Sequence, residues 1–179
     1  MSDTLVPIRS WIMPLWAAGV GTNCRERAGR AADLDLSHLG ITVKRTPAFN
    51  RAFGKNPPTL LEAGSITAFE LGRAAEGIEV WRFFERHTFS TLGIKHIRDA
   101  IEVHYHPDSK RRLTEEASID NRCFCRDPEG TLHAISISRL APRTWCAGMP
   151  ERYDPERLGG VWKKGTVALG FGVYEYAHA

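Results

Sequence analysis

The chain has 179 residues, of which 42% are hydrophobic and 25% are charged, with 24 Lys and Arg residues against 21 Asp and Glu residues. These values lie at the average for globular proteins, so they exclude an intrinsically disordered chain, a collagen-like repeat and a coiled coil. A chain of this length buries roughly two-thirds of its unfolded surface, which is enough for one core without disulfides. We therefore expect a single globular domain over residues 1–179.

The net charge of +3 is unevenly distributed. Residues 1–60 contain eight basic residues and four acidic ones, whereas the remainder of the chain has a slight acidic excess. The basic residues of this N-terminal third are Arg9, Arg25, Arg27, Arg30, Lys44, Arg45, Arg51 and Lys55. A local excess of this kind favours an acidic partner such as nucleic acid, although +3 alone does not define one.

Cysteine content and hydropathy predict the compartment. The four cysteines (Cys24, Cys123, Cys125 and Cys146) are too few for a disulfide scaffold, so we expect reduced thiols. The apolar stretch Trp11–Val20 is interrupted by Pro14 and is shorter than the roughly 20 residues that span a membrane. It also lacks the pattern of a signal peptide. We expect a cytoplasmic protein that does not enter a membrane.

The first half of the chain predicts one strand and several helices. Residues 26–32 are rich in Ala and Arg and indicate a short helix, and residues 41–45 alternate and indicate a strand. A loop with two prolines follows at residues 54–58. Residues 65–75 then read as one helix, and residues 79–87 as a second one with Val80 and Phe84 stacked at i, i+4.

The next helix is predicted by an apolar stripe of Ile94, Ile97 and Ile101, with Ser90 as its N-cap. The last third predicts strands. Residues 122–126 and 131–140 flank a turn at 127–130, and residues 166–176 alternate with period two. We predict an α+β fold, with an antiparallel or mixed sheet and a central helical segment, about residues 65–104, packed on it.

The hairpin carries two cysteines close to a histidine. A four-residue turn would pair Phe124 with His133 and Cys123 with Ala134. Both cysteines would then share one face and His133 would lie on the other, so we expect buried small residues and no zinc site within the hairpin.

A metal site is the alternative at residues 101–106. In a strand, Glu102, His104 and His106 would share a face and could bind iron or zinc. In a helix, residues two apart point in different directions, and these residues would form its solvated end. The sequence leaves both conformations open, and with them a metal-dependent enzyme.

The last predicted strand suggests a binding surface. Gly170 and Gly172 lie on one face with Tyr174, and paired glycines form a bare backbone patch where a ligand can approach or where the sheet bends over a helix. Basic and aromatic residues nearby are typical of a platform for single strands. The predicted surface comprises Arg143, Trp145, Trp162, Lys163, Lys164, Gly170, Gly172 and Tyr174.

We therefore predict a non-catalytic module, without a cofactor, that binds single-stranded nucleic acid, RNA, or a protein complex that handles nucleic acid. A metal-dependent enzyme using Glu102, His104 and His106 is the first alternative. The second is a small inhibitor or adaptor that binds one protein partner, with Trp145 and Trp162 as exposed anchors.

Overall fold

The computed structural model describes residues 11–20, 34–54, 64–110, 112–149 and 156–172, and within these the side chains of all but residues 17–20. The elements in chain order are β1 (Ile12–Val20), a 3-10 turn η2 (Ser37–Leu39), β2 (Thr42–Arg45), α1 (Pro47–Phe53), β3 (Gly64–Leu71), β4 (Ala75–Glu76), α2 (Gly77–Arg86), α3 (Ile94–Tyr105), β5 (Asn121–Arg126), β6 (Leu132–Ala141), β7 (Thr144–Gly148), β8 (Val161–Trp162) and β9 (Val167–Phe171).

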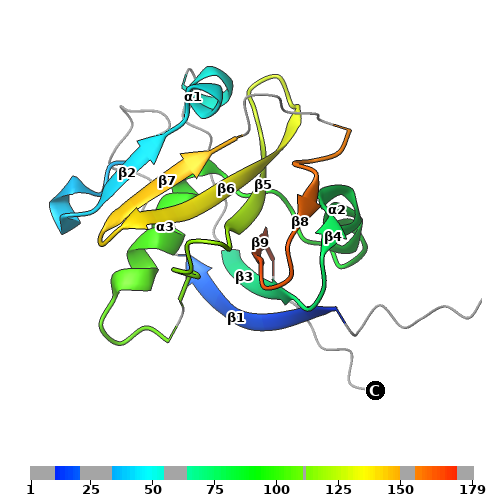
Figure 1. Ribbon diagram of the computed structural model, residues 1–179, viewed down its shortest axis with the longest axis horizontal. Coiled ribbons are helices and arrows are strands. Elements are labelled where there is room, and N and C mark those ends of the chain that lie inside the picture. The colour runs from blue at the N-terminus through cyan, green and yellow to red at the C-terminus, as the bar shows by residue number, and fades with distance from the viewer. Residues whose placement is uncertain (1–10, 21–33, 55–63, 111, 150–155, 173–179) are drawn as a thin grey trace, which may run out of the picture.

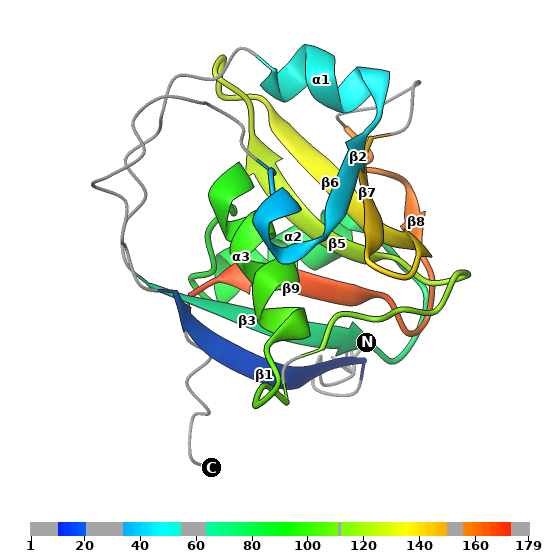
Figure 2. The same ribbon diagram turned by 90° about the vertical axis from the view of Figure 1, so that its left-hand side faces the viewer.

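Seven of the strands form one mixed sheet in the order β1-β3-β9-β5-β6-β7-β2, and β4 pairs with β8 separately (Figure 1). The β9–β5 and β7–β2 pairs are parallel, and the other pairs are antiparallel. The predicted α+β class is confirmed, and of the two sheet types expected the sheet is the mixed one. Figure 2 shows β1 and β2 at opposite edges of this sheet.

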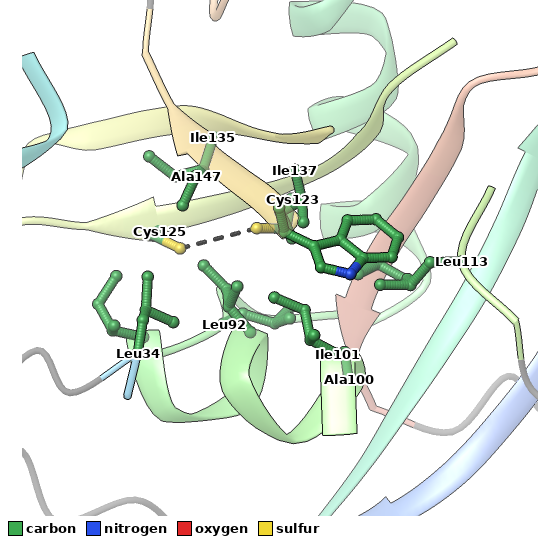
Figure 3. Close-up of a cluster of buried hydrophobic side chains, with 14 of the residues drawn as sticks. Leu34, Leu92, Ala100, Ile101, Leu113, Cys123, Cys125, Ile135, Ile137 and Ala147 are labelled. Carbon is green, nitrogen blue, oxygen red and sulfur yellow. Dashed lines mark hydrogen bonds between the residues drawn. The ribbon is translucent and has the colours of Figure 1, made fainter. Parts of the chain in front are cut away.

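Each face of the sheet packs on its own hydrophobic core. On one face, α3 contributes Ile97 and Ile101 against Cys123, Ile135 and other inward residues of β5, β6 and β7 (Figure 3). On the opposite face, α2 covers the central strands with a cluster of aromatic side chains: Phe69, Phe83, Phe84, Phe89, Phe124 and Trp162. The central strands are therefore buried on both faces.

Residues 65–75 do not form the helix expected from the sequence. They contain β3 instead, in which Ile66 and Ala68 face the α3 core while Phe69 and Leu71 face the α2 core. A strand buried on both faces loses the alternation that distinguishes strands from helices in a sequence. The β-branched pair Ile66 and Thr67 was the available signal for a strand.

The next two helices are confirmed, but their first residues differ from the prediction. α2 starts at Gly77 behind a capping box, in which the Glu79 carboxylate accepts a hydrogen bond of 2.9 Å from the Glu76 N–H. α3 has Gly93, not Ser90, as its N-cap. Ser90 forms a β-bridge with Phe171 instead, which brings the connection between the helices beside β9.

The strand β2 and the hairpin β5–β6 are confirmed, but the predicted register of the hairpin is wrong. The strand predicted at 166–176 is present as β9 over Val167–Phe171, it does not include Gly172, and residues 173–176 lie outside the described residues. Cys125 pairs with His133, one residue away from the expected register. The Asp127 N–H bonds to the Thr131 carbonyl at 3.0 Å, and Gly130 has a φ of +87°. The Gly130 N–H also donates to the Asp127 carbonyl at 2.9 Å. Three residues, 128–130, thus connect Asp127 to its partner Thr131, where a four-residue turn was expected between Arg126 and Thr131, and the left-handed Gly130 makes this shorter connection possible.

The register shift moves His133 to the same face of the hairpin as the two cysteines, because directly paired residues share a face. There the His133 ring packs edge-on against Phe53 at 5.6 Å, and its Nε2 lies 2.7 Å from an Asp127 carboxylate oxygen. The two cysteines are buried in the α3 core, as predicted. The helix expected at 26–32 and the loop residues 55–58 lie outside the described residues.

Candidate functional site

The two tryptophans predicted as exposed anchors are fully buried. Trp145 packs against α3 and donates a hydrogen bond of 2.9 Å from Nε1 to the Tyr105 hydroxyl. Trp162 stacks on Phe124 with ring centroids 5.1 Å apart and donates to the Leu158 carbonyl. Neither ring can stack on a base or anchor a partner at the surface, and the inhibitor alternative loses its expected contact residues.

The glycine patch on β9 is occupied by side chains of this chain. A Cβ atom at Gly170 would lie 3.0 Å from the Phe84 ring and 3.2 Å from Phe89, and one at Gly172 would lie 3.0 Å from Phe89. Aromatic residues in and just after α2 therefore pack closely on the two glycines, and no ligand needs to occupy this space. This packing agrees with the other explanation offered by the sequence, in which the glycines allow the sheet to bend over a helix. Tyr174 lies outside the described residues.

Residues 101–105 are helical, so Glu102, His104 and His106 do not converge. His104 is 5% exposed and points into the core, whereas Glu102 and His106 are exposed. Among the residues that the structure describes, no group of three or more His, Cys, Asp or Glu side chains is arranged to hold a metal ion. The geometry therefore does not supply the ligand set on which the enzyme alternative was based.

The predicted cations are at the surface. Lys163 and Lys164 form the exposed turn before β9, where the Lys163 ammonium lies 3.4 Å from the Ser118 carbonyl oxygen. Arg143 is exposed just before β7, donates to the Leu39 carbonyl at 2.7 Å, and lies 5.1 Å above the Tyr105 ring. Since β7, β5 and β9 run in one direction, these three cations lie at the same end of the sheet.

A polar area of the sheet, which we call the polar sheet face, lies on the side opposite to α3, since its residues alternate with those of the α3 core. It consists of Lys44 on β2, Cys146 on β7, Ser136 and Ser138 on β6, and Asp120 just before β5. Lys44 pairs with Cys146, which pairs with Ser138, and the Ser138 hydroxyl donates to the Asp120 carboxylate at 2.7 Å. In Figure 1 no helix or strand of the described chain lies in front of β6, β7 and β2.

The polar sheet face carries one ion pair, in which Arg122 lies 3.3 Å from Asp120, and the cations Lys44, Lys163 and Lys164 on or beside it. Within the described part of the chain, no salt bridge involves Lys44, Arg143, Lys163 or Lys164. Burial raises the pKa of the Cys146 thiol, while Lys44 lowers it and Asp120 raises it. Cys146 is therefore a neutral thiol at pH 7, and the face offers thiol and ammonium donors. The Ser136 and Ser138 hydroxyls donate their protons to the Gly148 carbonyl and to Asp120, so their oxygens can act only as acceptors.

Sequence reasoning missed the polar sheet face because its residues come from three strands and from the segment before β5. The signal that could have found part of it was the alternation of Ser136 and Ser138 with the buried residues Ile135 and Ile137 in β6. Lys44 and Cys146 are brought together by the parallel β2–β7 pair, which joins distant parts of the chain.

Comparison with known proteins finds no matching family model, no matching curated protein and no matching solved structure. Function is therefore argued from the geometry of this chain alone. In the parts of the chain that the structure describes, no helix has the length and apolar character needed to cross a membrane.

Proposed function

We propose that the polar sheet face and the cations beside it bind single-stranded nucleic acid, without catalysis. The observation that carries the proposal is an area of small hydroxyl and thiol side chains that includes the exposed Lys44 and has the exposed Lys163 and Lys164 at one end. Lysine ammonium groups neutralise phosphates and donate hydrogen bonds to their oxygens. The small side chains of Ser136, Ser138 and Cys146 leave room for a strand to lie across this part of β6 and β7.

The form of binding follows from the residues present. Because Trp145 and Trp162 are buried, stacking on bases contributes little at this surface, and phosphate contacts supply most of the affinity. Three phosphate contacts with a single strand, from Lys44, Lys163 and Lys164, predict a slope of log K against log salt of about −2. The same slope corresponds to a roughly 20-fold weaker affinity on going from 50 to 200 mM salt.

The proposed activity needs no cofactor and no membrane. Cys123, Cys125 and Cys146 are free thiols, in keeping with the cytoplasmic compartment that we propose for the protein.

Fluorescence anisotropy with labelled oligouridine, oligothymidine and a duplex of equal length tests the proposal. We expect binding of the single strands at 50 mM salt, and at least a tenfold loss of affinity in the Lys163→Glu/Lys164→Glu variant. Arg82→Glu/Arg86→Glu, which makes the same charge change at exposed positions of α2, is the matched control and should bind nearly as well as the wild type. Absence of binding at 50 mM salt, or equal losses in the two variants, would overturn the proposal.

A further inference from the structure

The segment between α3 and β5 is attached to α3 through both ring nitrogens of His104. Nδ1 accepts a hydrogen bond of 3.0 Å from the Leu113 backbone N–H, and Nε2 lies 2.8 Å from a Glu115 carboxylate oxygen. A backbone amide can only donate, so Nδ1 carries no proton in this arrangement. The ring is therefore the neutral tautomer with its proton on Nε2, donated to Glu115.

The surroundings of His104 hold the ring in this orientation. Its ring packs edge-on against Tyr105 at 4.8 Å and against Trp145 of β7 at 5.3 Å. Three charged groups lie around the ring. Glu115 contacts the ring itself, and Arg139 of β6 pairs with Glu115. Arg112 donates a hydrogen bond to the His104 carbonyl. One acidic and two basic groups thus surround an imidazole that is 5% exposed.

The segment held by His104 connects several parts of the fold. Leu113 is 3% exposed and belongs to the α3 core, where Figure 3 shows it beside Ile101. The Arg112 carbonyl accepts a hydrogen bond of 3.3 Å from the Trp16 indole of β1. Release of residues 112–113 would therefore disturb the contact with β1 as well as the core beneath α3.

We propose that His104 is a pH-operated latch, in which protonation of Nδ1 releases Leu113 and the adjoining segment from α3. An imidazolium has a proton on both nitrogens, so its Nδ1–H would face the Leu113 N–H, and two donors cannot bond to each other. The Nε2–H bond to Glu115 survives protonation, so the ring remains in place while the Leu113 amide loses its acceptor. A buried N–H without an acceptor is unfavourable, so the free energy falls when the Leu113 amide moves into water.

The direction of the pH dependence follows from the environment. Burial lowers the pKa of His104, the Glu115 carboxylate opposes this effect, and Arg112 and Arg139 add to it. A histidine with a lowered pKa is neutral in the folded protein at pH 7, and the unfolded chain binds its proton first as the pH falls. The latch is thus closed above the ordinary histidine pKa of 6.5 and weakens as the pH falls below it.

Hydrogen exchange of the Leu113 amide, followed by NMR and corrected for the intrinsic effect of pH, tests the latch. We expect its protection factor to fall at least tenfold between pH 7.5 and pH 5, while the amides of β5 and β6 stay protected. His104→Gln offers an acceptor and a donor that do not titrate, and should remove the pH dependence. His106→Gln, at an exposed position two residues away, is the matched control and should keep it.

An unchanged Leu113 protection factor in the wild type, or the same pH dependence in His104→Gln, would overturn the latch. Equal loss of protection in β5 and β6 would also overturn it, since that result means global unfolding. The ring nitrogen resonances of wild-type His104 give a test that needs no variant. Nδ1 must be unprotonated at pH 7.5, and its protonation must follow the same curve as the loss of Leu113 protection; a protonated Nδ1 at pH 7.5 contradicts the proposal.

Discussion

Gly77, the first residue of α2, lies directly against the carbonyl oxygen of Leu158. A Cβ atom at position 77 would overlap this oxygen and lie 2.9 Å from the Trp162 indole nitrogen. The Gly77 N–H also donates to the Gly160 carbonyl at 2.8 Å, and residues 158–160 all have positive φ. The start of α2 is therefore fixed by a left-handed turn from a distant part of the chain, and only glycine fits at this contact.

Replacing Gly77 by Ala should reduce the free energy of unfolding by about 3 kcal/mol, because the methyl group meets backbone atoms that cannot rotate away. Urea unfolding followed by circular dichroism measures the loss. Gly130→Ala is the control: nothing lies within 4 Å of its Cβ position, so only its positive φ opposes the change, at a cost of about 1 kcal/mol. Equal losses in the two variants would show that the contact with Leu158 is unimportant.

The cysteines should differ in their reactivity. Cys146 on the polar sheet face is partly exposed, whereas Cys123 and Cys125 are at most 1% exposed, with sulfur atoms 3.9 Å apart (Figure 3). In a Cys24→Ser background, we expect Ellman's reagent to modify one thiol of the folded protein and three after unfolding. Because burial raises the pKa of Cys146, its reaction should be slower than that of a free thiol at neutral pH, and its rate should still be rising at a pH where that of a free thiol levels off.

Cys146→Ser should leave no fast-reacting thiol in the same background, and Cys125→Ser should leave the fast reaction unchanged. Fast modification of the Cys125 thiol in the native protein would contradict its burial, since the neighbouring Cys123 thiol and burial both raise the pKa of Cys125.

His96 should make the stability of the protein depend on pH. It is 5% exposed, its Nδ1 accepts a hydrogen bond of 3.0 Å from the Gly93 N–H, and its ring stacks on Phe171 at 4.6 Å. Burial lowers its pKa, Asp99 opposes the effect and Lys95 adds to it. The unfolded state then binds the proton first, so stability is complete above about pH 6.5 and declines as the pH falls.

Urea unfolding at several pH values between 7.5 and 5 measures this decline. His96→Gln should be less stable than the wild type at pH 7.5 but lose less stability on acidification. It should keep part of the pH dependence, because His104 contributes separately. His38→Gln, at an exposed position in η2, should retain the wild-type slope. A His96→Gln variant with an unchanged slope would contradict the assignment.

Local patterns predicted the parts of the fold whose residues interact with near neighbours. The stripe of Ile94, Ile97 and Ile101 gave α3, and the Asp-Pro-Glu-Gly sequence at 127–130 gave the hairpin. Its register was missed because the left-handed conformation of Gly130 decides the loop length, and four turn residues alone do not specify it.

The candidate site was harder to predict because exposure depends on distant contacts. Trp145 and Trp162 have charged neighbours in the sequence, but Tyr105 and Phe124 bury them in the fold. Of the predicted surface residues that the structure describes, Arg143, Lys163 and Lys164 are exposed. A cation in a turn is exposed in most folds, whereas the position of an aromatic residue beside a cation depends on the tertiary structure.

The position of β9 has a consequence for synthesis of the chain. β9 is the last strand described, yet it lies between β3 and β5 and is the strand through which β1–β3 joins the rest of the sheet. Until residue 171 has left the ribosome, β3 and β5 each present an unpaired edge, and such edges promote aggregation. The sheet can be completed only after β9 has been synthesised, so a nascent chain stalled before β9 should depend on chaperones to remain unaggregated.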